Sequence, residues 1–431
     1  MAQRIVCAGG ALRGTLSVPG NKSQTHRALM FGALADGPSR IRCGLDAGDT
    51  RCTRAAMVAC GAQVDNDAEG WVVRPPDRLG EPADVIDCGN SGTTIRLLAG
   101  LFAGQPDRFF VLTGDGSLRR RPMGRIIEPL RAMGADIWAR DGDRLAPLAI
   151  RGRVLAGVHH DLALPSAQLK SALLLAGLRT GISLTQPGES RDHTERMLQA
   201  LGAPLTTDGT RIELEPVERL SAFDWTISGD PSSAAFWLVA ASVTPGSELR
   251  LTEVGLNPTR TGVIEVLQAM GADLEITVTA LDPEPRGEIV VRHASLRGTR
   301  IDGALALRAL DELPVLGVAA AFADGTTTIA DAAELRVKES DRLARMETGL
   351  KAFGIDVEPL PDGMRIEGQP QPQDVATMPR VDGSGDHRIV MAFAVAGHVR
   401  GGVVLDGAEE VGSSYPSFFD DLERLSEGTP A

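Results

Sequence analysis

The stretch that decides the fold reads Asp87-Cys88-Gly89-Asn90-Ser91-Gly92-Thr93-Thr94-Ile95-Arg96, followed by the apolar run Leu97-Leu98-Ala99-Gly100-Leu101-Phe102. A glycine-rich turn delivers small polar residues to the start of a helix whose remainder suits burial. The first N–H groups of such a helix have no partner within it, and the helix dipole is positive at that end. The stretch therefore predicts either an ordinary cap or a helix start that binds an anion.

The same construction occurs six times, which favours the anion-binding interpretation. The other five copies begin near Lys22, Pro165, Gly229, Asp311 and Gly385. A short strand pattern follows each copy, at 39–42, 108–113, 182–186, 248–252, 326–330 and 402–406. In five copies a second helix ends at a glycine that fits a left-handed C-cap, namely Gly61, Gly134, Gly202, Gly271 and Gly354. The chain thus predicts six α/β units with a period of about 70 residues.

Composition narrows the classes of protein and of partner. A chain of 431 residues suits about two domains, with three units in each. The net charge of −13 argues against nucleic acid or an acidic membrane as a partner. The longest apolar runs, such as 234–243, are too short to span a membrane. Five cysteines without a CxxC pair indicate reduced thiols in a cytoplasmic protein.

Basic residues gather where the units begin, although the protein is acidic. They are Lys22, Arg27, 119–121, Arg191, Arg336, Lys338, Arg342 and Arg388. If the helix starts converge, these cations and the helix dipoles favour a ligand that carries phosphates and carboxylates. Any single arginine among them could equally be a solvated surface residue. The chain has no P-loop and no GxGxxG after a strand, so a dinucleotide cofactor is not expected.

Two acidic residues could titrate within that cationic field. Asp311 begins an apolar helix, where it is either a cap or a general base. Glu339 follows Lys338 and precedes Arg342 by three residues, so it is either a general acid or half of an i,i+3 ion pair on an exposed face.

These residues stand in long motifs that resemble the enolpyruvyl transferase family, in its branch that uses shikimate 3-phosphate as acceptor. The motifs cover nearly the whole chain: 19–27, 89–96, 121–124, 166–168, 191–194, 229–233, 335–342 and 386–388. The resemblance implies an α/β fold of two domains, each with three βαβαββ units and buried helices. It implies a discontinuous first domain, 1–20 and 228–431, and a second domain, 21–227. The hinge crossings are then expected near 18–21 and 227–230.

The resemblance also implies the reaction and its residues. The enolpyruvyl group of phosphoenolpyruvate is transferred to the 5-hydroxyl of shikimate 3-phosphate, and phosphate is released without a cofactor or metal. Asp311 is expected to act as base and Glu339 as acid, while Lys22 shares proton transfer. The residues expected at shikimate 3-phosphate are Lys22, Ser23, Arg27, Ser166, Ala167, Gln168, Arg191, Asp311 and Lys338. Those expected at phosphoenolpyruvate are Lys22, Gly92, Arg121, Gln168, Arg342 and Arg388. A monomer is expected.

Two other interpretations remain open at this stage. The sister branch, which uses UDP-N-acetylglucosamine, commonly has a cysteine where Gly116 stands and an asparagine where Ser23 stands. The second is a phosphometabolite-binding protein that has lost the chemistry, although Lys22, Asp311 and Glu339 are all present, or a paralogue that acts on a related cyclic alcohol, because Gln24 and Thr25 lie beside the acceptor residues. Gly92 is alanine in some glyphosate-tolerant members, so the glycine here predicts sensitivity to glyphosate.

Overall fold

The computed structural model describes residues 2–370 and 377–426, and the chain divides into two compact units. Unit 1 comprises Met1–Pro19, Ser228–Leu281 and Pro285–Ala431; unit 2 comprises Gly20–Ile227 and Asp282–Glu284. Apart from the short segment Asp282–Glu284, the chain passes between the units after Pro19 and again after Ile227. That these crossings act as hinges between two domains stays a prediction.

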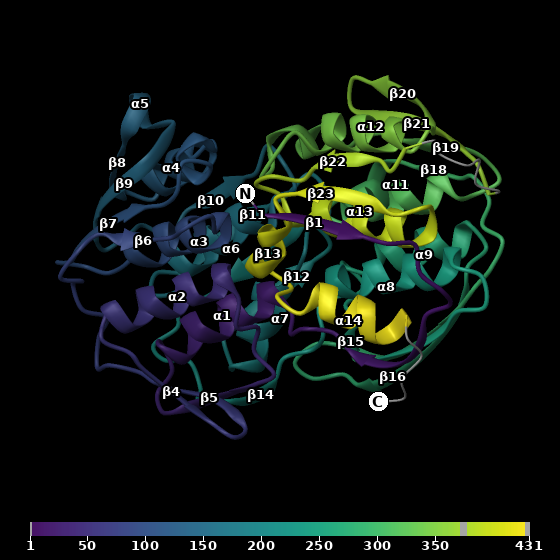
Figure 1. The fold of residues 1–431 in the computed structure, drawn as a ribbon. Coiled ribbons are helices and arrows are strands. Elements are labelled where there is room, and N and C mark those ends of the chain that lie inside the picture. Colours follow the sequence, from purple (N-terminus) through teal and green to yellow (C-terminus); the bar gives the residue numbers. More distant parts are fainter. Residues whose placement is uncertain (1, 371–376, 427–431) are drawn as a thin grey trace. The chain divides into compact units, whose positions relative to one another are not determined.

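The described residues form six sheets, one for each unit expected from the repeat (Figure 1). The second repeat shows the plan: β6 (Ile86–Asp87), α3 (Gly92–Ala103), β7 (Phe109–Thr113), α4 (Gly124–Ala132), β8 (Asp136–Ala139) and β9 (Leu145–Arg151). Its strand order is β6-β7-β9-β8, with β6 and β7 parallel and the other pairs antiparallel. Five of the described sheets have four strands and one has three, which confirms the α/β fold of repeated units.

Unit 2 holds two further sheets of this kind. The first is β14 (Asp224–Thr226), β3 (Ser39–Arg42), β5 (Gly70–Arg74) and β4 (Gln63–Asp67); the second is β10 (His159–Asp161), β11 (Ile182–Thr185), β13 (Arg211–Leu214) and β12 (Leu205–Asp208). Their helices are α1 (Lys22–Gly32), α2 (Gly48–Ala59), α6 (Ala167–Ala176) and α7 (His193–Ala200). The second repeat also contains two short helical turns, η1 (Leu118–Arg120) and α5 (Arg140–Asp143).

Unit 1 holds the other three sheets. Their strand orders are β16 (Asp273–Ala280), β17 (Arg286–Arg292), β15 (Glu248–Gly255) and β2 (Arg13–Ser17); β18 (Arg300–Ile301), β19 (Gly325–Ile329), β21 (Gly363–Gly368) and β20 (Asp356–Leu360); and β1 (Gln3–Val6), β23 (Val403–Asp406) and β22 (Arg380–Asp382). The helices are α8 (Pro231–Val243), α9 (Gly262–Ala269), α10 (Gly303–Arg308), α11 (Leu313–Ala321), α12 (Arg342–Ala352), α13 (His387–Val399) and α14 (Phe418–Ser426), with the turns η2 (Ala333–Val337) and η3 (Ala408–Ser413).

The helices that carry the repeated apolar runs form the core of each unit. In unit 1, α8, α11 and α13 contact one another, and every residue of α8 is buried (Figure 1). In unit 2, α3 packs against both α1 and α6. The five glycines expected at helix C-termini all have positive φ, between 75° and 100°. Small residues within the helices let their backbones approach closely, as Gly100 does at Ala172.

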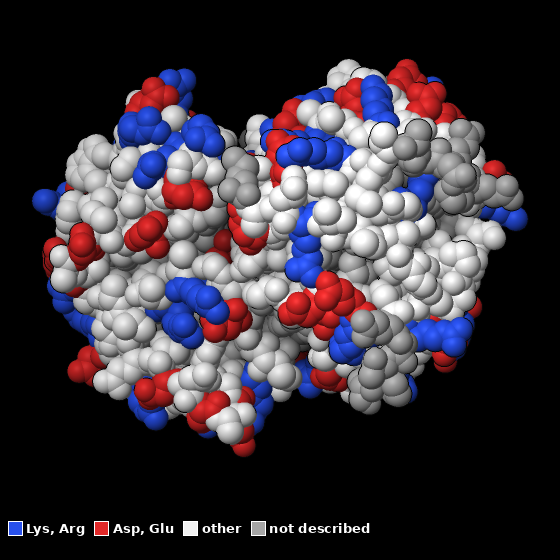
Figure 2. Space-filling view, viewed as in Figure 1, with Lys and Arg blue, Asp and Glu red and all other residues white. Residues whose placement is uncertain are grey.

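The surface carries charges of both signs. Figure 2 shows lysines and arginines next to aspartates and glutamates across the face in view. Ion pairs at the surface of unit 2 include Arg40–Asp67 and Arg42–Asp224. All five cysteines lie among the described residues and none forms a disulfide. Within 2–370 and 377–426, no helix is long and apolar enough to cross a membrane.

The close approach of α3 and α6 predicts a strong effect of one methyl group. A Cβ added at Gly100 would lie 2.0 Å from the backbone oxygen of Ala172, which cannot move without shifting α6. We expect Gly100→Ala to lower the free energy of unfolding by about 2 kcal/mol, because overpacked cores shift their backbones. Urea unfolding followed by tryptophan fluorescence measures it, since Trp71, Trp138 and Trp225 all lie in unit 2.

Gly37→Ala is the matched control, because its Cβ would meet only the Ala222 methyl group at an ordinary 3.6 Å. We expect that change to stay within about 0.5 kcal/mol of the parent. Equal stability of the two variants would show that α3 and α6 are not packed at this distance.

Candidate active site

The three buried helix starts of unit 2 have neutral caps. Asn21 caps α1 by accepting a hydrogen bond from Gln24 N at 3.1 Å. Ser91 caps α3 through Thr94 N at 3.1 Å, and Ser166 caps α6 through Leu169 N at 3.4 Å. Because none of these caps is charged, the positive end of each helix dipole is left for a ligand anion.

The three buried helix starts of unit 1 carry carboxylates instead. Asp230 caps α8 through Ser232 N at 2.9 Å, and Asp386 caps α13 through Arg388 N at 3.0 Å. Glu312 stands at the same position of α11, although its side chain makes no capping bond. These carboxylates offset the dipoles, so an anion here needs additional cations.

In unit 2, residues of α3, α6 and the segment after η1 come together as one cationic group, here called the unit 2 cluster: Gly92, Thr93, Arg96, Arg121 and Gln168. Arg96 donates to Gln168 Oε1 at 2.6 Å, and Gln168 Nε2 donates to Thr93 Oγ1 at 3.1 Å. A Cβ at Gly92 would lie 3.1 Å from Arg96 Nη1 and 3.2 Å from Arg121 Nη1. Two arginines therefore flank the glycine at the start of α3.

Lys22 and His26 lie on α1 and are joined to neighbouring helices. Lys22 Nζ forms an ion pair with Asp49 Oδ2 at 2.9 Å. His26 Nδ1 lies 2.7 Å from Thr53 Oγ1, which lies 2.7 Å from Thr94 Oγ1. Burial lowers the pKa of His26 well below its ordinary value, and the charges of Lys22 and Arg27 lower it further. His26 is thus a neutral ring in the interior of unit 2.

Arg27 is held by three protein groups rather than lying loose in a cleft. It is 3% exposed, and it donates to Thr194 Oγ1 and Ser171 Oγ at 2.6 Å each. A further bond joins its Nη1 to the backbone oxygen of Ser23 at 2.9 Å. The guanidinium is therefore oriented before any ligand binds. Thr25, by contrast, is fully buried, and its hydroxyl bonds to the backbone of Asn21 and Leu45.

Arg191 is half-buried and lies in a segment fixed by buried charges on both sides. Lys170, on α6, pairs with Glu195 of α7 at 2.5 Å and also donates to the backbone oxygen of Ser190 at 3.2 Å. His193 Nδ1 lies 2.8 Å from a carboxylate oxygen of Glu284. Because Lys170 and Glu195 are almost fully buried, each is needed to neutralise the other.

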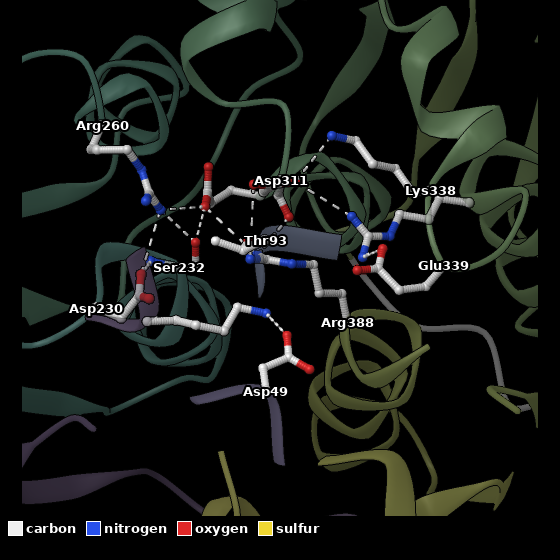
Figure 3. A network of polar contacts seen from close by, with 12 residues as sticks. Asp49, Thr93, Asp230, Ser232, Arg260, Asp311, Lys338, Glu339 and Arg388 are labelled. Atoms are coloured by element: carbon white, nitrogen blue, oxygen red, sulfur yellow. Dashed lines mark hydrogen bonds and ion pairs between the residues drawn. The ribbon is translucent and has the colours of Figure 1, made fainter. Parts of the chain in front are cut away.

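In unit 1, the expected base and acid lie with three cations in a second group, here called the unit 1 cluster: Asp311, Lys338, Glu339, Arg342 and Arg388 (Figure 3). The Asp311 carboxylate lies 3.5 Å from Arg342 Nη1, 3.7 Å from Lys338 Nζ and 4.0 Å from Arg388 Nη2. Arg388 also donates to the backbone oxygen of Asp311 at 2.9 Å. Asp311 is thus a partly exposed carboxylate faced by three cations.

Arg342 is the fully buried centre of the unit 1 cluster. Its Nε donates to Asp386 Oδ2 at 2.8 Å and its Nη2 to Glu339 Oε2 at 2.6 Å. Burial would lower the pKa of Arg342, but the charges of Asp386 and Glu339 outweigh burial and raise it. The i,i+3 ion pair of Glu339 therefore exists, yet it lies in a part-buried cluster and not on the exposed face that the sequence suggested.

The structure brings many of the expected site residues together within each unit. Their roles in binding and catalysis stay predictions. Sequence analysis missed several residues that hold them in place, namely Asp49, Lys170, Ser171, Thr194, Glu195 and Arg260. Among the residues that the structure describes, no group of three or more His, Cys, Asp or Glu residues could hold a metal ion.

Comparison with known proteins gives this arrangement its family. The enolpyruvyl transferase NikO from Streptomyces tendae shares the fold at a TM-score of 0.75 and 17% identity, over 98% of this chain and 96% of that one. EPSP synthase from Acinetobacter baumannii superposes at a TM-score of 0.87 with 40% identity, covering 99% and 98%. The fold is that of the enolpyruvyl transferases.

The match to one family within this class covers nearly the whole chain. Residues 6–422 match the model of EPSP synthase (3-phosphoshikimate 1-carboxyvinyltransferase). A 3-phosphoshikimate 1-carboxyvinyltransferase of Anaeromyxobacter sp. (strain Fw109-5) is 51% identical over 425 residues, which is 97% of each chain. The chain belongs to the EPSP synthase family of transferases.

The buried, neutral His26 predicts a pH dependence of stability. Below its ordinary pKa of about 6.5 the unfolded chain protonates this ring but the native protein does not. Its contribution is therefore complete above that pH and is lost, by up to about 1.4 kcal/mol per pH unit, as the pH falls. We expect His26→Gln to be less stable than the parent at pH 7.5, and the gap to narrow towards pH 5.

Denaturant unfolding of both proteins at several pH values measures this gap. The comparison with the variant cancels the titration of other groups, such as buried His398. A gap that stays constant from pH 7.5 to pH 5 would mean that His26 takes up its proton as readily in the native protein as in the unfolded chain.

Proposed function

We propose that this chain transfers the enolpyruvyl group of phosphoenolpyruvate to the 5-hydroxyl of shikimate 3-phosphate and releases phosphate, a step in aromatic amino acid biosynthesis. The observation that carries the proposal is the match, over 97% of each chain and at 51% identity, to a relative named 3-phosphoshikimate 1-carboxyvinyltransferase. The clustering of Asp311 with three cations supports it independently, because the reaction needs a base within a field that attracts anions.

We assign the acceptor mainly to residues at the start of α6 and on α1. The N–H groups at the start of α6, including that of Ala167, suit the 3-phosphate, and the family resemblance assigns Arg191 of unit 2 and Lys338 of unit 1 to the same phosphate. Ser23 and the pre-oriented Arg27 suit the carboxylate. Gln168 is assigned to both substrates.

We assign phosphoenolpyruvate to residues of both units, most of them cationic. In unit 2 these are Gly92, Arg121 and Gln168, with Lys22 nearby on α1; in unit 1 they are Arg342 and Arg388. Arg96 is an addition from the structure, since it holds Gln168 at 2.6 Å and faces the Cβ position of Gly92. A trianionic substrate gains from each of these charges.

The two carboxylates take opposite roles in the proposed chemistry. Asp311 accepts the proton of the 5-hydroxyl as that oxygen attacks C2 of phosphoenolpyruvate. Glu339 donates a proton to the CH2 carbon, which becomes the methyl group of a tetrahedral intermediate. Loss of phosphate and of a proton from that methyl group then restores the double bond. Lys22 shares in these proton transfers.

The ion pair of Glu339 with Arg342 constrains this assignment, because a carboxylate paired at 2.6 Å holds no proton to donate. Arg342 holds the Asp386 carboxylate through Nε at 2.8 Å and through Nη2 at 3.3 Å, so the side of the guanidinium that faces Glu339 and Asp311 is the part that we assign to a substrate anion. A substrate anion there competes with Glu339, and a carboxylate that loses its cation takes up a proton more readily. Substrate binding would thus prepare the acid.

We also propose a cytoplasmic monomer that needs no cofactor or metal. The cysteines, none of which forms a disulfide, and the small-molecule substrates support the cytoplasmic location. The UDP-N-acetylglucosamine interpretation has no support in the curated relatives described above. The paralogue interpretation loses one of its reasons, because buried Thr25 serves the local backbone and does not face an acceptor.

Acceptor choice is the direct test of the proposed function. We expect phosphate release from phosphoenolpyruvate with shikimate 3-phosphate and none with UDP-N-acetylglucosamine, measured in parallel on the purified chain. Release with the sugar nucleotide alone would move the chain to the sister activity. No phosphate release with either acceptor would favour a binding protein.

Variants of the two carboxylates sharpen that test. We expect Asp311→Asn and Glu339→Gln to lower kcat by about 10²–10⁴-fold, which is the usual contribution of a general acid or base. Glu358→Gln is a control, since Glu358 is an exposed carboxylate of β20 paired with Arg365. Equal kcat values in all three variants would contradict the roles proposed for Asp311 and Glu339.

Sensitivity to glyphosate is a separate prediction that depends on Gly92. Nothing projects from Gly92, whereas an added Cβ would crowd both flanking guanidiniums at 3.1 and 3.2 Å. We expect the parent to be inhibited by glyphosate, and Gly92→Ala to need at least about tenfold more inhibitor, as one carbon in a tight pocket commonly costs. Inhibition assays at fixed phosphoenolpyruvate measure it. Near-full activity of the parent in millimolar glyphosate would contradict the prediction.

A further inference from the structure

Unit 1 contains a second buried arginine that neither the motifs nor the proposed reaction uses. Arg260 lies between β15 and α9 and is 1% exposed. Its Nη2 donates to Ser232 Oγ at 2.6 Å and lies 3.2 Å from Glu312 Oε1 and 3.4 Å from Asp230 Oδ1 (Figure 3). It therefore joins the start of α8 to the start of α11.

Glu312 connects Arg260 to the unit 1 cluster. Its carboxylate is fully buried, and Oε1 accepts a hydrogen bond from Ser232 as well as from Arg260. The same oxygen lies 3.7 Å from Arg388 Nη1, the nitrogen that donates to the backbone oxygen of Asp311 at 2.9 Å. Arg388 is thus shared between the buried Glu312 and the base Asp311.

The charge of Arg260 determines whether Arg388 stays beside Asp311 or pairs with Glu312. A buried carboxylate needs a compensating cation, and Glu312 has two arginines within 4 Å. With Arg260 present, Glu312 is neutralised without drawing Arg388 closer than 3.7 Å. Without Arg260, Arg388 is the remaining arginine within 4 Å of Glu312 among the residues that the structure describes, and their attraction in a buried site is strong. Arg388 would then move onto Glu312 and away from Asp311.

We infer that Arg260 is a positioning residue for the phosphoenolpyruvate site, which acts by neutralising Glu312 so that the charge of Arg388 stays available to the substrate. The inference rests on the proposed function for the identity of the substrate. A purely structural role, in which Arg260 only pins two helix starts, is the competing explanation. The two differ in what happens to substrate affinity.

Steady-state kinetics separate these explanations. We expect Arg260→Met to raise KM for phosphoenolpyruvate about tenfold, the effect of losing one charged hydrogen bond, with KM for shikimate 3-phosphate changed less than about twofold. Arg260→Lys keeps the charge and should raise it only about threefold. Adding Glu312→Gln to Arg260→Met removes the uncompensated carboxylate and should restore most of the lost affinity.

Arg400→Met is the matched control, because Arg400 is a buried arginine of unit 1 that bonds to Gln369. We expect that variant to melt at a lower temperature with both KM values unchanged. If Arg260→Met and Arg260→Lys also melt at a lower temperature with both KM values unchanged, the positioning role is wrong. The role is also wrong if the double variant is no better than Arg260→Met.

Crystal structures of the parent and Arg260→Lys or Arg260→Met give a readout that does not depend on activity. We expect Arg388 in the Met variant to approach Glu312 more closely than 3.7 Å and to lose its bond to the Asp311 carbonyl. An unmoved Arg388 would overturn the inference even if the parent is active. If the parent released no phosphate, the proposed function would fail while this test still decided the positioning role.

Discussion

The burial of six helix starts is the constraint on which the rest of this protein depends. Each buried helix brings its first N–H groups and the positive end of its dipole into a region with little water. Polar groups there must be satisfied by the protein or by a ligand. The two units meet this requirement differently, and that difference underlies the proposed assignment of substrate anions.

Unit 2 uses neutral caps, namely Asn21, Ser91 and Ser166, and keeps its cations beside the helix starts. Unit 1 uses carboxylates at Asp230, Glu312 and Asp386, and then neutralises them with buried arginines. Arg260 serves the first two of these carboxylates, and Arg342 serves the third. The helix starts of unit 2 are therefore suited to bind phosphate directly, whereas unit 1 offers arginine and lysine side chains.

Much of the fold could be predicted because its signals are local. The strand at 39–42 was placed at its observed limits, and the glycines that end the second helices have the expected positive φ. Helix starts could be predicted from short polar stretches before apolar runs. The sharing of Arg342 with Asp386, 44 residues away, could not, because such a pair depends on how α12 and α13 pack. Arg260 was missed for the same reason: its segment carries no periodic pattern, and its partners are 28 to 52 residues distant.

The acidic caps of unit 1 also explain why an arginine can be buried there and still serve a ligand. Arg342 would be costly to bury alone, and Asp386 compensates it through Nε and Nη2 without using all of its donors. Glu339 and Asp311 take the remaining side of the guanidinium only at the edge of the cluster, where both are partly exposed. In the proposed site, a substrate anion would compete with these two for Arg342 and leave the buried Asp386 in place. The same side chain is thus part of the core on one side and part of the proposed site on the other.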